Sequence, residues 1–132
     1  MPNELVWVPV EAVVEHNQLE LADTGEHHFV RDIGLLESAL ARPRNAFAYG
    51  EDDLVVLAVT LMDGVSRAHA FEQGNKRTAF GAMRLFLRAN GCDTTFDDTV
   101  DWAEKMIELL EHKLTEDEFV ELVRPFIVEN PT

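Results

Sequence analysis

The sequence predicts an all-α fold, a compact six-helix bundle formed by a single domain over residues 1–132. Two observations lead to this prediction. Almost every segment with regular hydrophobic spacing repeats with the helical period of about 3.6 residues, and prolines, glycines and asparagines separate these segments. The chain is also long enough to bury one core without disulfides or a structural metal.

Two helices and a loop are expected first. A helix over residues 9–21 begins with Pro9, which suits a first helical position, and continues with a stripe of valines and a leucine. A second helix begins after Asp32 and is predicted to end at Pro43, because a proline disfavours helical geometry in the residue before it. Residues 42–50 lack a helical period and are predicted to form a loop or short hairpin.

The centre of the bundle is expected at residues 52–68, which are apolar around nearly the whole helical circumference. Gly74 and Asn75 break the helical pattern after this segment. A further helix is expected over residues 76–89, and residues 90–91, Asn-Gly, form a favourable C-terminal stop.

Two more helices complete the predicted bundle. Residues 97–99 are expected to open an amphipathic helix that ends near residue 113. Thr115 and Glu118 then have the spacing of a capping box, in which the hydroxyl accepts from the third helical N–H and the carboxylate reaches back. The last helix is therefore expected from this box to about Val128.

The charge distribution restricts the possible ligands. The formal net charge is −14, which argues against nucleic acid as a partner, because nucleic-acid binding needs a surface rich in Lys and Arg. Residues 67–88 differ from the rest, since five basic residues and one acidic residue give them a net charge of +4. This cationic segment could hold a small anion. Arg84 and Arg88, four residues apart, could equally coat the solvent side of a helix.

The cysteine content and the lack of long apolar segments predict an intracellular protein. Cys92 is the single cysteine, so no internal disulfide can form. No apolar run reaches membrane-spanning length, and the first residues do not resemble a signal peptide. We therefore expect a cytoplasmic protein without a membrane partner.

Residues 69–77, with the sequence HAFEQGNKR, form the densest group of reactive side chains in the chain. They lead from the predicted central helix into the start of the next one, where free N–H groups and the helix dipole favour an anion. Gly74 would allow close approach of a ligand, and Asn75 could orient an oxygen atom. Lys76 supplies a compact positive charge, and Arg77 supplies a planar fork for two phosphate oxygens.

His69 adds chemistry that the other residues lack. A neutral imidazole can take a proton from an attacking hydroxyl, which is the task of a general base in phosphoryl or nucleotidyl transfer. Phe71 is expected to anchor the loop in the core. The alternative without catalysis is that His69 caps a helix and that the cations Lys76 and Arg77 are merely solvated. A Walker A loop is a poor match, since Lys76 is followed by Arg77, and a metal site at residues 26–28 would need adjacent side chains to converge on one ion.

The sequence HAFEQGNKRTA, followed by a segment ending FLRANG, resembles the signature of the Fic/Doc family, His-x-Phe-x-(Asp/Glu)-(Gly/Ala)-Asn-(Gly/Lys)-Arg. The resemblance is closest to the Doc (death-on-curing) branch, covers about residues 30–91 and includes the upstream sequence RDIGLLESALARPRN. It implies a compact all-α domain that transfers a phosphate-containing group, usually AMP from ATP, to a hydroxyl of a target protein.

The resemblance also implies roles for single residues. His69 would be the general base, Gly74 and Asn75 part of the anion-binding loop, and Arg77 a ligand of the nucleotide phosphates. Lys76 occupies the position of a glycine in most AMP-transferring members. A lysine at this position is characteristic of Doc toxins, which phosphorylate elongation factor Tu and are held inactive by an antitoxin from the same operon.

By the same resemblance, the segment from Arg44 to Tyr49 corresponds to a flap that pairs with the target's backbone. The implied target-binding residues are Arg44, Asn45, Ala46 and Phe47. The self-inhibitory helix motif of some Fic proteins is not found in this sequence, so a separate antitoxin chain is expected to restrain the protein.

Gln73 departs from the family pattern, which has an acidic residue there to hold Mg²⁺ against the phosphates. A neutral amide oxygen should bind Mg²⁺ more weakly than a carboxylate. Three outcomes stay open: Mg²⁺ carried by the nucleotide and water, Mg²⁺ held through a shifted Glu72, or no productive turnover. The leading hypothesis is a Doc-like transferase toxin that uses ATP. The alternatives are a catalytically weakened nucleotide- and protein-binding module and a purely structural helical adaptor.

Overall fold

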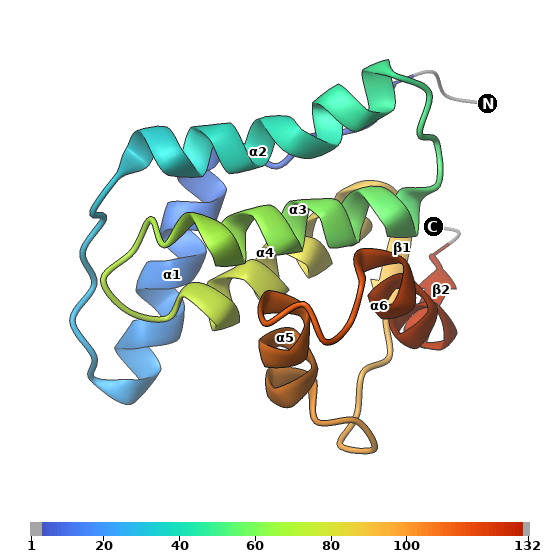
Figure 1. The fold of residues 1–132 in the computed structure, drawn as a ribbon. Coiled ribbons are helices and arrows are strands. Elements are labelled where there is room, and N and C mark those ends of the chain that lie inside the picture. Colours follow the sequence, from blue (N-terminus) through green and yellow to red (C-terminus); the bar gives the residue numbers. More distant parts are fainter. Residues whose placement is uncertain (1–3, 131–132) are drawn as a thin grey trace.

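The central helix of the fold is α3 (Leu54–Ala68), seen in a computed structural model that describes residues 4–130 (Figure 1). Every residue from Leu57 to Ser66 is buried, as the apolar sequence of this segment predicted. Asp53 begins the helix, because its carboxylate accepts hydrogen bonds from the first free N–H groups. The remaining elements are arranged around this buried helix.

Three other helices pack around α3. α2 (Ile33–Ala48) and α4 (Asn75–Ala89) contact it directly, and α1 (Val10–Thr24) packs against α4. α1 lies close to α4 at Gly81, where an added Cβ would overlap the His16 ring, so the present position of that ring depends on glycine. This packing places α1 beside the start of α4.

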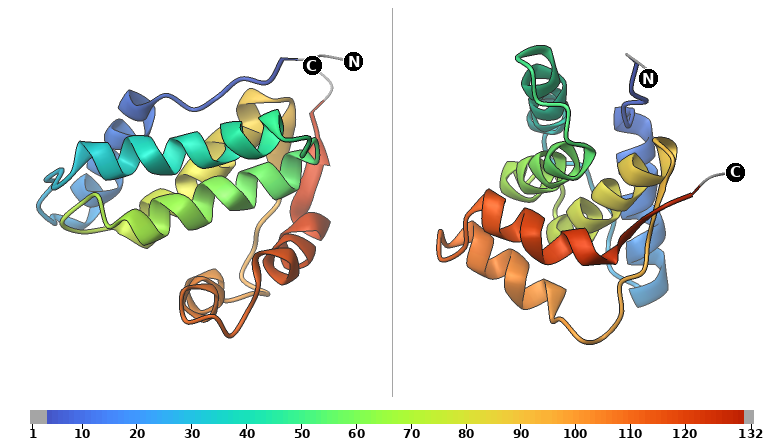
Figure 2. Two further views of the ribbon diagram at one scale, coloured as in Figure 1. Left: turned by 45° about the horizontal axis from the view of Figure 1, so that its top comes forward. Right: turned by 90° about the vertical axis from the view of Figure 1, so that its right-hand side faces the viewer.

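The C-terminal elements form a second group. α5 (Trp102–Leu110) and α6 (Glu116–Val123) lie on the side of α3 away from α2 (Figure 2). A short 3₁₀ helix η1 (Arg124–Phe126) leads to strand β2 (Ile127–Glu129), which pairs antiparallel with β1 (Cys92–Thr94). The predicted all-α class and six helices are confirmed for residues 4–130, with this small sheet added.

Both of the last two helices are shorter than predicted. α5 begins at Trp102 rather than at residues 97–99, because Asp101 accepts the capping hydrogen bond from the Glu104 N–H. The capping box of Thr115 and its glutamate is present at the start of α6. α6 ends at Val123 instead of near Val128, since the following proline lacks a helical donor and the chain then pairs with β1.

The prediction of a loop or hairpin over residues 42–50 is wrong for most of the segment, because α2 continues through Pro43 to its end at residue 48. Tertiary packing overrides the local preference. Pro43 is buried, and α2 lies so close to α3 that a Cβ on Gly64 would be 3.2 Å from the Arg42 side chain. Arg42 also forms ion pairs with carboxylates of α3 and α6, which hold the second half of α2 in place.

No helix among residues 4–130 is long and apolar enough to cross a membrane.

Candidate functional site

The motif loop, residues 69–74, joins the end of α3 to the start of α4 (Figure 1). This placement confirms the predicted helix–loop–helix arrangement. His69 ends α3 in the left-handed conformation, with φ 49° and ψ 41°, so the chain turns sharply out of the helix at this residue. The His69 side chain is exposed, and no hydrogen bond to its ring occurs within the described residues.

The start of α4 has the properties of an anion site. Within residues 4–130, no side chain caps this helix, so the first N–H groups remain available to a ligand. Gly74 precedes the helix with φ 77°, a left-handed conformation that favours glycine. An added Cβ would lie 3.0 Å from Leu21 and 3.2 Å from the Asn17 amide, so the close neighbour of Gly74 is α1.

Asn75 has a structural role in the loop. Its Oδ1 accepts a hydrogen bond from the Phe71 N–H at 3.1 Å, and its Nδ2 donates to the Phe71 carbonyl at 2.8 Å. Phe71 is fully buried, as expected for an anchor. Both ends of the amide that was predicted to orient a ligand oxygen are therefore engaged with the backbone of the motif loop.

Lys76 and Arg77, both exposed, lie on the first turn of α4 and line a cleft of about 340 Å³ between α1, α4 and α5. Phe80 and Trp102 contribute apolar surface to this cleft, and His69 is not among its lining residues. The cationic side chains of α4 therefore face a partly apolar cleft rather than open solvent only.

Arg77 is ion-paired with Glu26, with Nη2 and Oε1 2.8 Å apart. The pKa of Glu26 lies below its ordinary value because the Thr24 hydroxyl, and then Arg77, donate hydrogen bonds to its carboxylate. Arg84 and Arg88 also line the cleft and bond to β1, through Thr94 and Asp93 respectively. Both arginines are thus bonded to side chains of β1. They are neither unpaired ligands for an anion nor unpaired residues on the solvent side of the helix.

The segment between α1 and α2 lies against the motif loop, which the sequence did not predict. The Arg31 N–H donates to the Ala70 carbonyl at 2.7 Å, and the Glu72 N–H donates to the Phe29 carbonyl at 3.0 Å. An isolated antiparallel bridge joins residues 30 and 71. The available signal was weak: a few β-prone residues after Gly25, which ends α1.

The segment predicted to form the target-binding flap does not lie beside the motif loop. The connection between α2 and α3 is at the end of α3 opposite to the motif loop (Figure 1). Residues 44–47 are helical, so their backbone presents no free strand edge for pairing with a target. The structure therefore does not bring Arg44, Asn45, Ala46 and Phe47 beside His69.

α1 also contributes Asn17 to the loop. This side chain is fully buried, and its Nδ2 donates to the Gln73 carbonyl and to the Thr78 hydroxyl, both at 2.9 Å. A sequence signal was present, because Asn17 interrupts the buried stripe of Val13 and Leu21 at four-residue spacing. A polar residue on such a stripe needs a partner in the core.

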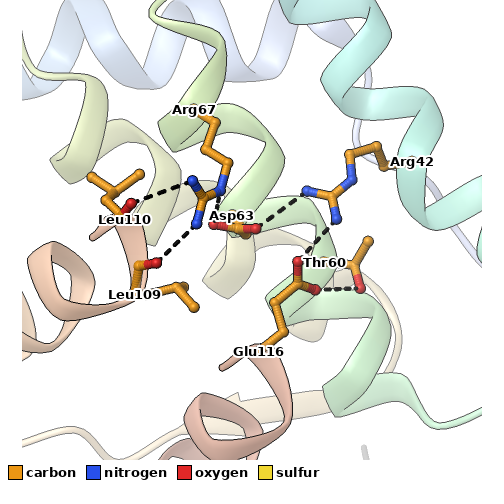
Figure 3. A network of polar contacts seen from close by, with 7 residues as sticks. All are labelled: Arg42, Thr60, Asp63, Arg67, Leu109, Leu110 and Glu116. Carbon is orange, nitrogen blue, oxygen red and sulfur yellow. Dashed lines mark hydrogen bonds and ion pairs between the residues drawn. The ribbon is translucent and has the colours of Figure 1, made fainter. Parts of the chain in front are cut away.

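A separate ionic network supports the end of α3 (Figure 3). The Asp63 side chain is only 4% exposed and lies between Arg67, at 2.8 Å, and Arg42, at 3.5 Å. Arg67 also donates to the Leu109 carbonyl at 2.8 Å, while Arg42 pairs with Glu116 at 2.9 Å. Burial, and then the nearby Asp63, raise the pKa of Glu116 despite this arginine.

Comparison with known proteins agrees with this architecture. A family model described as Fic/DOC family matches residues 7–87. The chain belongs to the Fic/DOC family. This match spans α1, α2, α3, the motif loop and nearly all of α4, whereas β1, α5 and α6 lie outside it.

Two curated proteins are similar to this Fic/DOC chain. Toxin Doc of Mycolicibacterium smegmatis is 44% identical over 81 residues, which cover 59% of this chain and 62% of that protein. Protein kinase doc of Escherichia phage P1 is 39% identical over 61 residues, covering 46% of this chain and 48% of that protein. The chain thus spans less than two thirds of the length of each relative.

Proposed function

We propose that this chain is a Doc-like toxin that transfers a phosphate-containing group from ATP to a hydroxyl of a target protein. The observation that carries the proposal is the motif loop, which connects the exposed, unpartnered imidazole of His69 to the uncapped start of α4 within the described chain. Family membership and the names of the two relatives, a toxin and a protein kinase, support the same activity.

The start of α4 would bind the phosphates. Its free N–H groups and the positive end of its dipole favour negative charge, and Lys76 and Arg77 project from the same turn. The ion pair with Glu26 uses one nitrogen of the Arg77 guanidinium, which leaves further donors for a phosphate oxygen. Lys76 adds a mobile point charge beside these groups.

His69 would act as the general base. In the proposed phosphoryl transfer, the target hydroxyl oxygen forms a bond to the γ-phosphorus, the bond to the bridging oxygen breaks, and ADP leaves. His69 takes the hydroxyl proton. Transfer of AMP is the alternative within the same site, with attack at the α-phosphorus and pyrophosphate as leaving group. We favour phosphoryl transfer because Lys76 stands where most AMP-transferring members of the family have a glycine. One relative is also named a protein kinase.

The residues near the motif loop are suited to a Mg²⁺ ion that arrives already bound to ATP. They are less suited to a Mg²⁺ ion that the protein alone would hold. Within residues 4–130, no three His, Cys, Asp or Glu side chains gather where they could hold a metal. The Gln73 carbonyl already accepts from Asn17, and the adjacent Glu72 is exposed. The protein could offer the amide oxygen of the Gln73 side chain, while Mg²⁺ would neutralise charge on the phosphates.

The proposal includes two protein partners. A toxin needs a cognate antitoxin, and we propose that a separate chain restrains this one. The target would be a cytoplasmic protein with an accessible hydroxyl, for which a translation factor such as elongation factor Tu is the first candidate.

Labelled ATP tests the activity. The purified protein is incubated with bacterial lysate and ATP labelled at either the γ or the α position. Label from the γ position on a lysate protein is expected, and His69→Ala should abolish it, whereas Lys113→Ala, exposed and distant from the motif in sequence, should not. Transfer from the α position would indicate AMP transfer. If neither label is transferred while Gln73→Glu is active, the natural chain is not an efficient enzyme.

A catalytically weakened binding module is the second candidate, favoured by Gln73 and by the engagement of Arg77 with Glu26. This module would bind ATP, detectable by calorimetry, without transferring label. His69→Ala would then change neither binding nor toxicity. Loss of toxicity in His69→Ala, with ATP binding intact, would exclude this candidate.

A further inference from the structure

The fully buried side chain of Asn17 joins α1 both to the end of the motif loop and to the first turn of α4. Its Nδ2 donates both to the Gln73 carbonyl, in the motif loop, and to the Thr78 hydroxyl, in the first turn of α4. The two acceptors lie on either side of Gly74, which itself packs against the Asn17 amide. The Asn17 amide thus ties the backbone at which α4 begins to α1.

The hydrogen-bond network fixes the orientation of this amide. A backbone carbonyl only accepts hydrogen bonds, so the atom facing Gln73 must be the nitrogen of the amide. The Asn17 oxygen therefore faces His28, whose Nδ1 lies 2.7 Å away. A neutral His28 must then carry its proton on Nδ1, because an amide oxygen cannot donate. The network runs from the His28 ring through Asn17 to the motif loop.

The second side of the loop is held by the backbone that follows His28. Residues 29 and 31 bond to the loop backbone at residues 72 and 70. Asn17 and this segment therefore hold the motif loop between them, and His28 links the two supports. Within the described residues, no side-chain cap on α4 shares this task.

We propose that Asn17 is a positioning residue of the anion site: its amide, oriented by His28, holds the Gln73 carbonyl and the start of α4 in the conformation that binds phosphate. The inference rests on the proposed function, because it concerns the same site. Loss of the two donated hydrogen bonds would let the loop relax away from α1. We expect affinity for ATP to fall about tenfold, an effect of the size expected for a buried donor pair.

Isosteric variants separate positioning from simple stability. Asn17→Asp keeps the shape and the acceptor for His28 but removes both Nδ2 donors. His28→Asn keeps a donor at the place of Nδ1, whereas His28→Phe removes it. Phe119→Leu, in the core at α6, serves as a control that destabilises the fold away from the loop.

The readouts are the Kd for ATP by calorimetry and amide hydrogen exchange of the motif loop, both at a temperature where all variants are folded. Asn17→Asp and His28→Phe should weaken ATP binding and speed exchange in the loop, His28→Asn should restore both, and Phe119→Leu should change neither. Equal loop exchange in Asn17→Asp and Phe119→Leu would overturn the inference.

The two proposals fail separately. If the natural chain does not bind ATP, the proposed function is wrong, while loop exchange still decides the role of Asn17. Nitrogen-15 chemical shifts of the His28 ring give a second decision without ATP. The neutral ring is expected to carry its proton on Nδ1. A neutral ring with its proton on Nε2 would contradict the network.

Discussion

Replacement of Arg67 by methionine is expected to destabilise the protein strongly, because it leaves the buried Asp63 carboxylate without its close partner. Arg67 lies 2.8 Å from Asp63, whose side chain is 4% exposed. The remaining partner, Arg42, is 3.5 Å away and 41% exposed. Methionine preserves the length and helix preference of the side chain, so the main loss is the charge and its hydrogen bonds.

The magnitude follows from burial. Removing one partner of a buried ion pair costs about 3–5 kcal/mol, and the persisting contact with Arg42 places Arg67→Met at the lower end, about 3 kcal/mol. Arg42→Met removes a longer contact and a half-exposed pair with Glu116, so about 1 kcal/mol is expected. The double change Asp63→Leu with Arg67→Met should cost less than Arg67→Met alone, since no unpaired buried charge remains.

Urea unfolding followed by far-UV circular dichroism at neutral pH measures these differences, with the free energy in water obtained by linear extrapolation. The loss is expected to be largest for Arg67→Met and smaller for both the double variant and Arg42→Met. If Arg67→Met were no less stable than Arg42→Met, or if the double variant were the least stable, the close pair would not be what stabilises Asp63.

Three smaller changes test other parts of the fold. Thr115→Ala removes the acceptor for the Glu118 N–H and should lower the free energy of unfolding by about 1 kcal/mol in the same urea titration, whereas Thr115→Ser should not. Gly74→Ala places a Cβ on a residue with φ 77° and should cost about 1–2 kcal/mol; an unchanged melting temperature would contradict this. The pKa of Glu26 is lowered from 4.5 by a threonine hydroxyl and Arg77, so its stabilisation is present above pH 4.5 and is lost as pH falls through the lowered pKa. Glu26→Gln should therefore reduce the acid sensitivity of the unfolding free energy, and identical acid titrations would exclude a stabilising pair.

Local patterns predicted the elements whose signals lie within one segment. The apolar circumference of residues 52–68 identified the buried helix α3, and the spacing of Thr115 and Glu118 identified the start of α6. The same reasoning failed at Pro43. The preference of a proline concerns one backbone position, whereas α2 buries four residues from Leu36 to Pro43, packs against α3 and is joined to α6 by the Arg42–Glu116 ion pair.

The sequence by itself determined that the chain is helical, that residues 69–77 lead from a buried helix into the start of the next, and that His69, Lys76 and Arg77 lie within these nine residues. These properties follow from hydrophobic period and residue chemistry over short stretches. Only the tertiary structure decided which parts of the protein support the loop. Asn17 reaches acceptors 56 and 61 residues further along the chain, and Glu26 reaches Arg77 over 51. Such partners are chosen by the packing of α1 on α4, which no local pattern contains.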